Sequence, residues 1–245
     1  MSADFQVENQ VLLRYRGTEA APVLPAEIRE IGDRAFEKCE TLVSLVIPDG
    51  VTRIGAHAFD GCKNLTALTL PESVTEFGVC PFEDCIGLAR DEHFLIFRDV
   101  LFQYFGEEDT VIVPTGITRI APEAFHYCWD VRRVILPEGV MEIGSNAFHC
   151  CKDLLEIALP DSLKTIGAGA FSACFALTGL AIPQAVRIIP PDLCSGCRSL
   201  TAVSFSEDAE EIGEAAFWFC ESLTRCTGRA QRIGANAFRH SPLAK

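Results

Sequence analysis

Cysteine and histidine are the residues of this 245-residue chain whose type and spacing could do chemistry. His126 and Cys128 are followed, 23 positions later, by His149 and Cys151, with Cys150 beside them. Imidazole nitrogens and thiolates are zinc ligands, so their tetrahedral convergence would form a metal site. The alternative is two exposed histidines beside buried thiols. The sequence favours this alternative because the cysteines belong to a longer series, and we predict no metal ligands.

A second arrangement with possible chemistry is the C-x-x-C motif of Cys194 and Cys197, a spacing used in redox and zinc sites. No second C-x-x-C accompanies it. A nucleophilic thiol also needs an activating base, and among the cysteines outside the main series only Cys150 has a histidine beside it. The sequence therefore predicts a protein that is not an enzyme and has no cofactor. A thiol-dependent or metal-dependent enzyme is the rival hypothesis.

The main cysteine series shows that the chain is a repeat array. Its members are separated by 23 residues, with one interval of 43: Cys39, Cys62, Cys85, Cys128, Cys151, Cys174, Cys197 and Cys220. Isoleucine, phenylalanine and proline columns follow the same period. Such a period is typical of a solenoid, in which each unit buries its apolar face against its neighbours. We therefore expect most thiols to be free, buried and small core side chains.

One repeat unit reads L-x-x-L-x-(I/L)-P-x-x-V-x-x-I-G-x-x-A-F-x-x-C-x-x. Residues 65–70 alternate apolar and small polar side chains before Pro71, which predicts one short parallel strand per unit. Apolar residues at i, i+4, i+5 and i+8 from Ile54 to Cys62 predict a helical or 3-10 turn. Glycine after the isoleucine, as at Gly55, predicts a bend with a positive φ or a close backbone approach.

The repeated motif I-G-x-x-A-F-x-x-C resembles the BspA-type, or treponemal-type, leucine-rich repeat, and the resemblance covers nearly the whole chain. It implies a right-handed α/β solenoid with one strand and one helical turn per 23-residue unit. Members of that family are mostly bacterial or protist proteins, often exposed at the surface, that bind proteins or host surfaces. The implied function is a non-enzymatic protein-binding scaffold of unknown ligand. Adhesion to a host or cell surface is the alternative.

Two segments outside the 23-residue period resemble each other at an offset of 89 positions. Residues 5–17 and 94–106 each have two apolar runs around a polar pair, which predicts a β-hairpin without the usual turn glycine. We therefore expect a single solenoid over residues 1–245. Its parts are an N-terminal hairpin cap (1–22), a first repeat block (23–88), a hairpin insert (89–110) and a second repeat block (111–245).

Charge and composition limit the partners and the location of the chain. The formal net charge is −13, which argues against nucleic acid because phosphate contacts require clustered lysine and arginine. A protein ligand, basic or glycan-bearing, is expected instead. No apolar run has the length of a membrane span, and no signal peptide is visible at the start. This predicts a cytoplasmic protein, or a secreted or cell-surface one if a signal has been removed.

Two groups of residues are candidates for binding a partner. Solenoids generally recognise partners on their strand surface, where this chain carries mostly small residues together with Arg133, Ile135 and Glu156. A tightly curved sheet that requires small side chains is the alternative explanation. The second group consists of aromatic residues at positions that are small or polar in other repeats, because tyrosine and tryptophan often anchor interfaces. Its members are Tyr127, Trp129, Phe175, Trp218 and Phe219.

We expect the chain to be a monomer at moderate salt. An acidic group would repel a second copy approaching the strand edge near Ser222–Cys226, and salt screens such repulsion. Its members are Glu207, Asp208, Glu210, Glu211 and Glu214. Light scattering across a salt series tests this expectation. The mass should be that of one chain at low salt, and a stable dimer there would contradict the charge argument.

Overall fold

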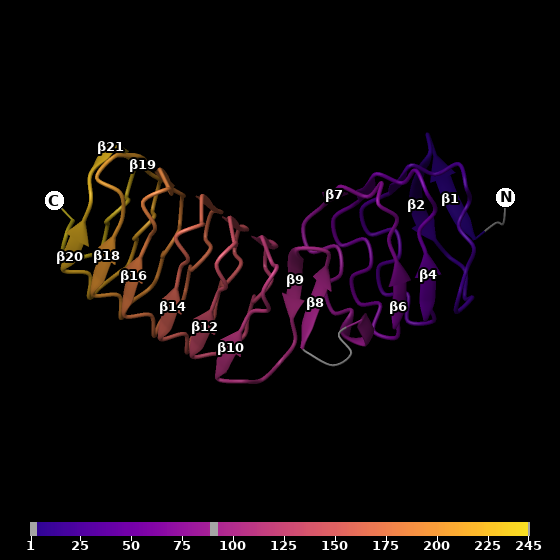
Figure 1. The fold of residues 1–245 in the computed structure, drawn as a ribbon, viewed down its shortest axis with the longest axis horizontal. Coiled ribbons are helices and arrows are strands. Elements are labelled where there is room, and N and C mark those ends of the chain that lie inside the picture. The colour runs from indigo at the N-terminus through magenta and orange to yellow at the C-terminus, as the bar shows by residue number, and fades with distance from the viewer. Residues whose placement is uncertain (1–3, 89–92, 245) are drawn as a thin grey trace. The chain divides into compact units, whose positions relative to one another are not determined.

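The computed structural model describes residues 4–88 and 93–244, which form a β-solenoid (Figure 1). The chain divides into two compact units, Met1–Leu95 and Ile96–Lys245. In each unit, short strands joined by turns repeat from coil to coil. Within the described ranges, no helix has the length and apolar character needed to cross a membrane.

The first unit contains two sheets. One sheet has the order β1-β2-β3-β5-β7, and the other pairs β4 with β6. The strands are β1 (Phe5–Glu8), β2 (Val11–Tyr15), β3 (Glu30–Ile31), β4 (Ser44–Val46), β5 (Arg53–Ile54), β6 (Ala67–Thr69) and β7 (Glu76–Phe77), and the 3-10 segment η1 (Ile86–Leu88) follows them. Ile31 lies beside Ile54 and Ile54 beside Phe77, so the register of the sheet reproduces the 23-residue period.

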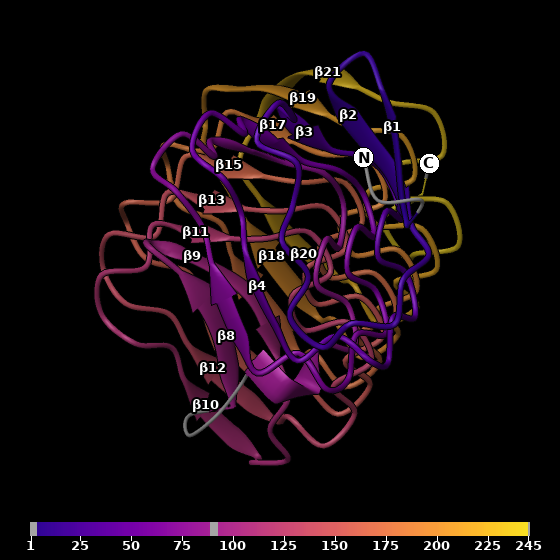
Figure 2. The same cartoon turned by 90° about the vertical axis from the view of Figure 1, so that its right-hand side faces the viewer.

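The second unit continues the same plan over more coils. Its sheets have the orders β15-β13-β11-β9-β8, β10-β12-β14, β16-β18-β20 and β17-β19-β21 (Figure 1 and Figure 2). The strands are β8 (Phe94–Phe97, which begins before the boundary between the units), β9 (Val100–Tyr104), β10 (Thr110–Ile112), β11 (Arg119–Ile120), β12 (Arg133–Ile135), β13 (Glu142–Ile143), β14 (Glu156–Ala158), β15 (Thr165–Ile166), β16 (Gly179–Ala181), β17 (Ile188–Ile189), β18 (Ala202–Ser204), β19 (Ala209–Ile212), β20 (Arg225–Thr227) and β21 (Ala230–Ile233). All pairs among β11 to β21 are parallel.

Both predicted hairpins are present. Strands β1 and β2 pair in antiparallel fashion around Asn9 and Gln10, whose φ angles are 50° and 66°. These left-handed conformations suit a tight two-residue turn in which glycine is usual, and asparagine tolerates them. Strands β8 and β9 are neighbours joined through Arg98 and Asp99. Residues 89–92 of the expected insert lie outside the described residues.

Each coil carries two short strands in different sheets, such as β12 and β13, so the prediction of one strand per 23-residue repeat is wrong. The helical turn predicted for each repeat is not confirmed. Apart from η1, the described I-G-x-x-A-F-x-x-C segments are chains of turns. The Ala147, His149 and Cys151 amides donate to carbonyls three residues back, whereas the Asn146 and Cys150 amides donate to the next coil. The two residues that donate outward have positive φ angles of 55° and 60°. A helix would use these amides internally, so the turn chain gains hydrogen bonds between coils that a helix would lack.

Phenylalanine side chains form the central column of the core. In the second unit Tyr104, Phe125, Phe148 and Phe171 stack in succession, with ring centroids 5.3, 4.8 and 5.4 Å apart. These separations lie in the range of favourable offset aromatic pairs. The column is buried, as the repeat pattern predicts for its phenylalanines.

The thiols form a second column with a polar role that the sequence did not suggest. The Cys151 thiol donates a hydrogen bond to the Phe125 carbonyl of the preceding coil at 3.0 Å, and Cys174 donates to Phe148 at 3.1 Å. The same contact recurs at Cys62, Cys85, Cys197 and Cys220. Cysteine at this position is therefore small enough for the core and still satisfies a buried carbonyl. The end members Cys39 and Cys128 are only half-buried.

Candidate functional site

A groove of about 460 Å³ crosses strands β14, β16, β18 and β20 of the second unit. In β14, β16 and β18 the central residue is buried and its two neighbours face outward. The outward positions in the groove carry small side chains, so the space above the sheet stays open. These residues are Ala158, Gly179, Ala181, Ala202 and Ser204.

Charged side chains stand at both ends of this strand-face groove. Arg133 and Glu156 are cross-strand neighbours on β12 and β14, and their charged atoms lie 2.7 Å apart. Both side chains are more than half exposed, so their ion pair contributes about 1 kcal/mol or less to stability. Arg225 lines the opposite end, and Ile135 is 41% exposed on β12. The structure thus brings the three predicted strand-surface residues together beside the groove.

Tyr127 and Trp129, two of the predicted aromatic contacts, lie together on the turn side of the second unit. Their ring centroids are 6.1 Å apart in an edge-to-face arrangement, and both side chains are about half exposed. The Lys152 ammonium lies 4.6 Å from the centroid of the Trp129 ring, within range of a cation–π interaction. His126 stacks on Tyr127 at 3.9 Å. This group presents an aromatic and a cationic surface at one place.

The other predicted aromatic residues lie on later coils. Arg198 is positioned over Phe175, 5.6 Å from the ring centroid. Trp218 and Phe219 meet edge to face at 4.5 Å, and of the two only Trp218 is exposed. Within the described residues, no ring contact joins Phe175 to Trp218 or to Trp129. The aromatic candidates therefore form three separate spots.

The histidine and cysteine pairs of the second unit lie on neighbouring coils. His126 and His149 have ring centroids 5.2 Å apart, and His149 Nε2 lies 3.2 Å from Cys150 Sγ. Burial lowers the pKa of both histidines. Burial also raises the pKa of Cys128 to about 12 and that of Cys151 well above its usual value, so both thiols stay protonated at neutral pH. Protonated thiols are poor metal ligands.

The C-x-x-C motif lies inside the core. Cys194 and Cys197 are both fully buried, and the Cys197 thiol donates to the Phe171 carbonyl at 3.0 Å. Burial raises the pKa of Cys194 well above its usual value. The motif is explained by packing, as its phase in the repeat suggests.

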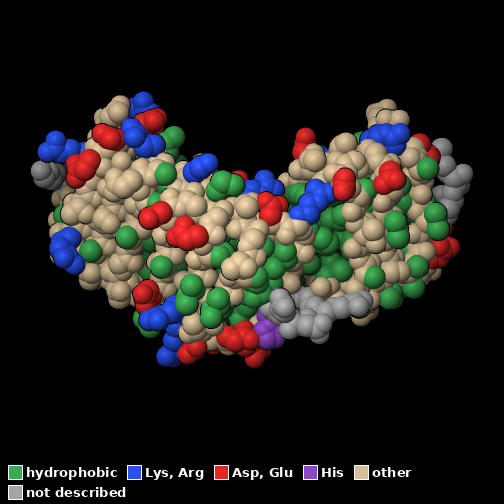
Figure 3. Space-filling model, viewed as in Figure 1, with side chains coloured by type: hydrophobic (Ala, Val, Ile, Leu, Met, Phe, Trp, Pro, Cys, Tyr) green, Lys and Arg blue, Asp and Glu red, His purple; other side chains and the backbone are tan. Residues whose placement is uncertain are grey.

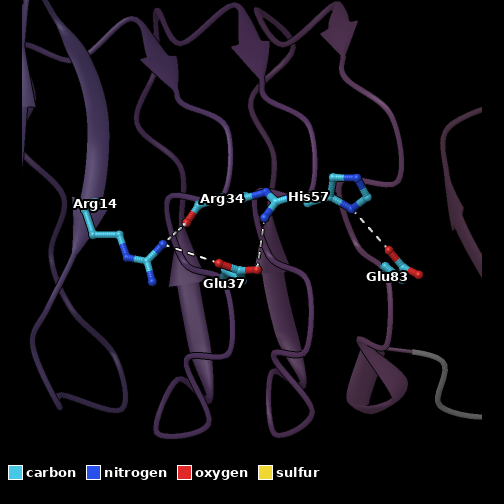
Figure 4. A network of polar contacts seen from close by, with 5 residues as sticks. All are labelled: Arg14, Arg34, Glu37, His57 and Glu83. Carbon is cyan, nitrogen blue, oxygen red and sulfur yellow. Dashed lines mark hydrogen bonds and ion pairs between the residues drawn. The ribbon is translucent and has the colours of Figure 1, made fainter.

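A polar cluster in the first unit was missed by sequence reasoning. His57 Nδ1 lies 3.1 Å from a carboxylate oxygen of Glu83 (Figure 4). Asp60 contributes a third donor atom, and all three lie within 4.8 Å of one another. Among the described residues, this is the one group of three such donor atoms so close together. Burial raises the pKa of Asp60, and the neighbouring His57 opposes this effect. The 23-residue spacing from Asp60 to Glu83 was the sequence signal that could have indicated their closeness, because it places them at equivalent positions of neighbouring coils.

A larger hollow, about 820 Å³, lies beside β20 and β21. Its lining includes Phe205, Ile212, Phe238 and Leu243, and Phe238 stacks on Phe217. Since this lining continues the core columns, we assign the hollow to the apolar core left uncovered by the described residues. Ile233 is 63% exposed there.

The comparisons with known proteins agree with this architecture. The family described as BspA type leucine rich repeat region, in 6 copies, matches residues 21–93 and 96–244. A leucine rich cell surface protein from Faecalibacterium prausnitzii has a similar structure, with 19% identity over 94% of this chain and 94% of that chain and a TM-score of 0.56. A leucine-rich repeat protein from Eubacterium ventriosum is also 19% identical over 96% and 89% of the chains, with a TM-score of 0.55.

The pneumococcal vaccine antigen PcpA is a third structural neighbour, with 19% identity over 89% of this chain and 72% of that chain and a TM-score of 0.51. At such identities the similarity shows the fold alone. The comparison with curated proteins gave no match. The family match, by contrast, spans most of the sequence. The chain belongs to the BspA-type leucine-rich repeat family.

Proposed function

We propose that the chain is a non-enzymatic protein-binding scaffold and that its partner lies in the strand-face groove of the second unit. The observation that carries this proposal is the 460 Å³ groove itself, which small outward residues keep open across four strands. Concave sites with few polar groups at their borders are typical of binding sites. Here the borders are the Arg133–Glu156 pair and Arg225.

The groove suggests the chemistry of the partner. Ala158, Ala181 and Ala202 offer an apolar floor that suits a narrow segment carrying small or apolar side chains. Arg225 has no ion-pair partner among the described residues, so its guanidinium is available to pair with a carboxylate of that segment. Acidic and basic side chains alternate in small groups among hydrophobic ones on the face in Figure 3. The net charge of −13 favours a partner that is basic as a whole.

The exposed aromatic residues are proposed as secondary contacts. Trp129 and Tyr127, with Lys152, would hold a partner that extends from the strand face to the turn side, and Phe175, Trp218 and Phe219 would add contacts on later coils. Aromatic anchors of this kind often carry a large share of binding energy. The partner could therefore be held mainly in the groove or mainly on the turn side. A partner held only by Trp129 would not need the groove.

We expect Ala181→Arg to abolish partner capture, because the long cationic side chain fills the groove. Wild-type, Ala181→Arg and Ala185→Arg proteins would serve as baits in cell extracts, with captured proteins quantified by mass spectrometry. Ala185 is an exposed alanine in a turn four residues away and controls for the added charge. The specific partner should fall at least about tenfold with Ala181→Arg, equivalent to about 1.4 kcal/mol, and stay unchanged with Ala185→Arg.

Two results would contradict the groove assignment. One is full capture by Ala181→Arg when its melting temperature matches the wild type. The other is loss of capture by Trp129→Ala together with full capture by Ala181→Arg, which would move the site to the turn side.

A cell-surface adhesion role is the second candidate. It is supported by two neighbours whose names describe a cell surface protein and a vaccine antigen. In that case the partner would be an extracellular protein or its glycan. The same capture from a surface fraction and from a cytoplasmic extract separates the two roles, because the partner is enriched in only one of them.

A further inference from the structure

The turn segments of the first unit align polar side chains from successive coils. Arg34 and His57 occupy equivalent positions 23 residues apart, and so do Glu37, Asp60 and Glu83. The His57 amide donates to the Val79 carbonyl at 2.9 Å, and the Gly61 amide donates to the Glu83 carbonyl at 2.9 Å. The backbone therefore holds the turn of residues 57–60 against the turn that carries Glu83.

The equivalent carboxylates of Glu37 and Asp60 differ in their partners. Glu37 forms ion pairs with Arg14 at 3.5 Å and with Arg34 at 3.6 Å (Figure 4). One coil later the equivalent carboxylate, Asp60, forms no hydrogen bond or ion pair with the described residues. Histidine stands at the position next to Asp60 where the preceding coil has Arg34.

We propose that His57, Asp60 and Glu83 bind a divalent transition-metal ion through one imidazole nitrogen and two carboxylate oxygens, with water completing the coordination. Their donor atoms lie within 4.8 Å of one another. Metal–ligand distances of about 2.0–2.2 Å require a modest further approach, which half-exposed side chains can make by rotation. The nitrogen donor favours ions such as Mn²⁺ or Zn²⁺ over Mg²⁺ or Ca²⁺, which prefer oxygen ligands.

The bound ion would join two coils of the solenoid. His57 and Asp60 belong to one turn segment and Glu83 to the next, so coordination would add a cross-link to the backbone hydrogen bonds. A ligand that binds only the folded state raises its stability. This inference concerns the first unit and does not depend on the proposed function of the groove.

Mn²⁺ is the probe for the test, because this ion has little affinity for the 12 cysteines that would bind Zn²⁺. Electron paramagnetic resonance of free Mn²⁺ measures binding, and electron spin echo modulation detects the nitrogen of a coordinated imidazole. We expect one bound Mn²⁺ per chain with one nitrogen coupling. His57→Asn should remove the nitrogen signal, and Asp60→Asn should weaken binding about tenfold or more.

The variants are matched to the repeat. His57 has a φ angle of 51°, and the equivalent positions Asn146 and Asn236 carry asparagine at 55° and 58°, so His57→Asn suits the backbone. Glu37→Gln is the control, because Glu37 occupies the same column as Asp60 but is paired with two arginines. It should change Mn²⁺ affinity less than about twofold.

Three results would overturn the inference. Wild-type protein that binds Mn²⁺ without a nitrogen coupling, or does not bind it, excludes the site without reference to any variant. Wild-type affinity in Asp60→Asn would also exclude it. An equal loss in Glu37→Gln would show that general negative charge, rather than these three ligands, attracts the ion.

Discussion

Ile143→Asp is expected to destabilise the second unit severely. Ile143 is 1% exposed and lies between Ile120 and Ile166 in the register of β11, β13 and β15. The substitution removes a buried aliphatic side chain and places a carboxylate without a partner in the core. We expect a loss of about 4 kcal/mol or more in the free energy of unfolding. Thermal melting followed by circular dichroism should show a fall of about 10 °C or more in the affected transition.

Glu138→Lys is the matched control for this experiment, since Glu138 is exposed in the turn before the same strand. Its melting temperature should stay close to that of the wild type, because surface substitutions usually change stability by less than about 0.5 kcal/mol. If Ile143→Asp melted within a degree or two of the wild type, the register of the isoleucine column would be wrong.

A single methyl group at Gly167 is expected to have the second large effect. A Cβ atom at this position would lie 2.3 Å from the Ser145 amide nitrogen of the preceding coil. The Gly167 amide also donates to the Ile143 carbonyl at 2.7 Å, so the two backbones cannot separate without losing this hydrogen bond. We expect Gly167→Ala to lower the free energy of unfolding by about 2 kcal/mol, measured by urea denaturation.

Gly179→Ala provides the comparison for Gly167→Ala. Gly179 lies on β16, and a Cβ atom there would come no closer than 3.8 Å to the Ala202 carbonyl. Its φ angle is not positive, so alanine should be tolerated or slightly stabilising. If both variants lost the same free energy of unfolding, the close approach of coils at Gly167 would not explain the effect. A general consequence of replacing glycine by alanine would explain it instead.

The sequence was sufficient to predict the stacking of the coils. A period of 23 residues places equivalent positions of neighbouring repeats side by side. The observed pairs Ile31 with Ile54 and Arg133 with Glu156 follow from it. Both hairpins were also predictable, because they depend on local alternation. The burial of most thiols of the cysteine column was predictable from their position within the repeat. The recurrence of glycine after the isoleucine column, as at Gly167, predicted a bend, although it left open whether a positive φ or a close approach required it.

The turn segments could not be predicted, because their apolar spacing suits a helix as well as a chain of turns. The choice is made by the amides of Asn146 and Cys150, which find carbonyls only when the next coil lies beside them. Such hydrogen bonds connect residues far apart in sequence, so no local pattern reports them.

The same reason separates the predicted site residues from those found only in the structure. The sequence by itself determined that Arg133 and Glu156 face outward on neighbouring strands, since strand alternation and the period are both local properties. Only the tertiary structure decided that small residues leave a groove beside them and that Asp60 meets His57 and Glu83. Open space and charge balance depend on every side chain around a point, and those side chains come from several coils.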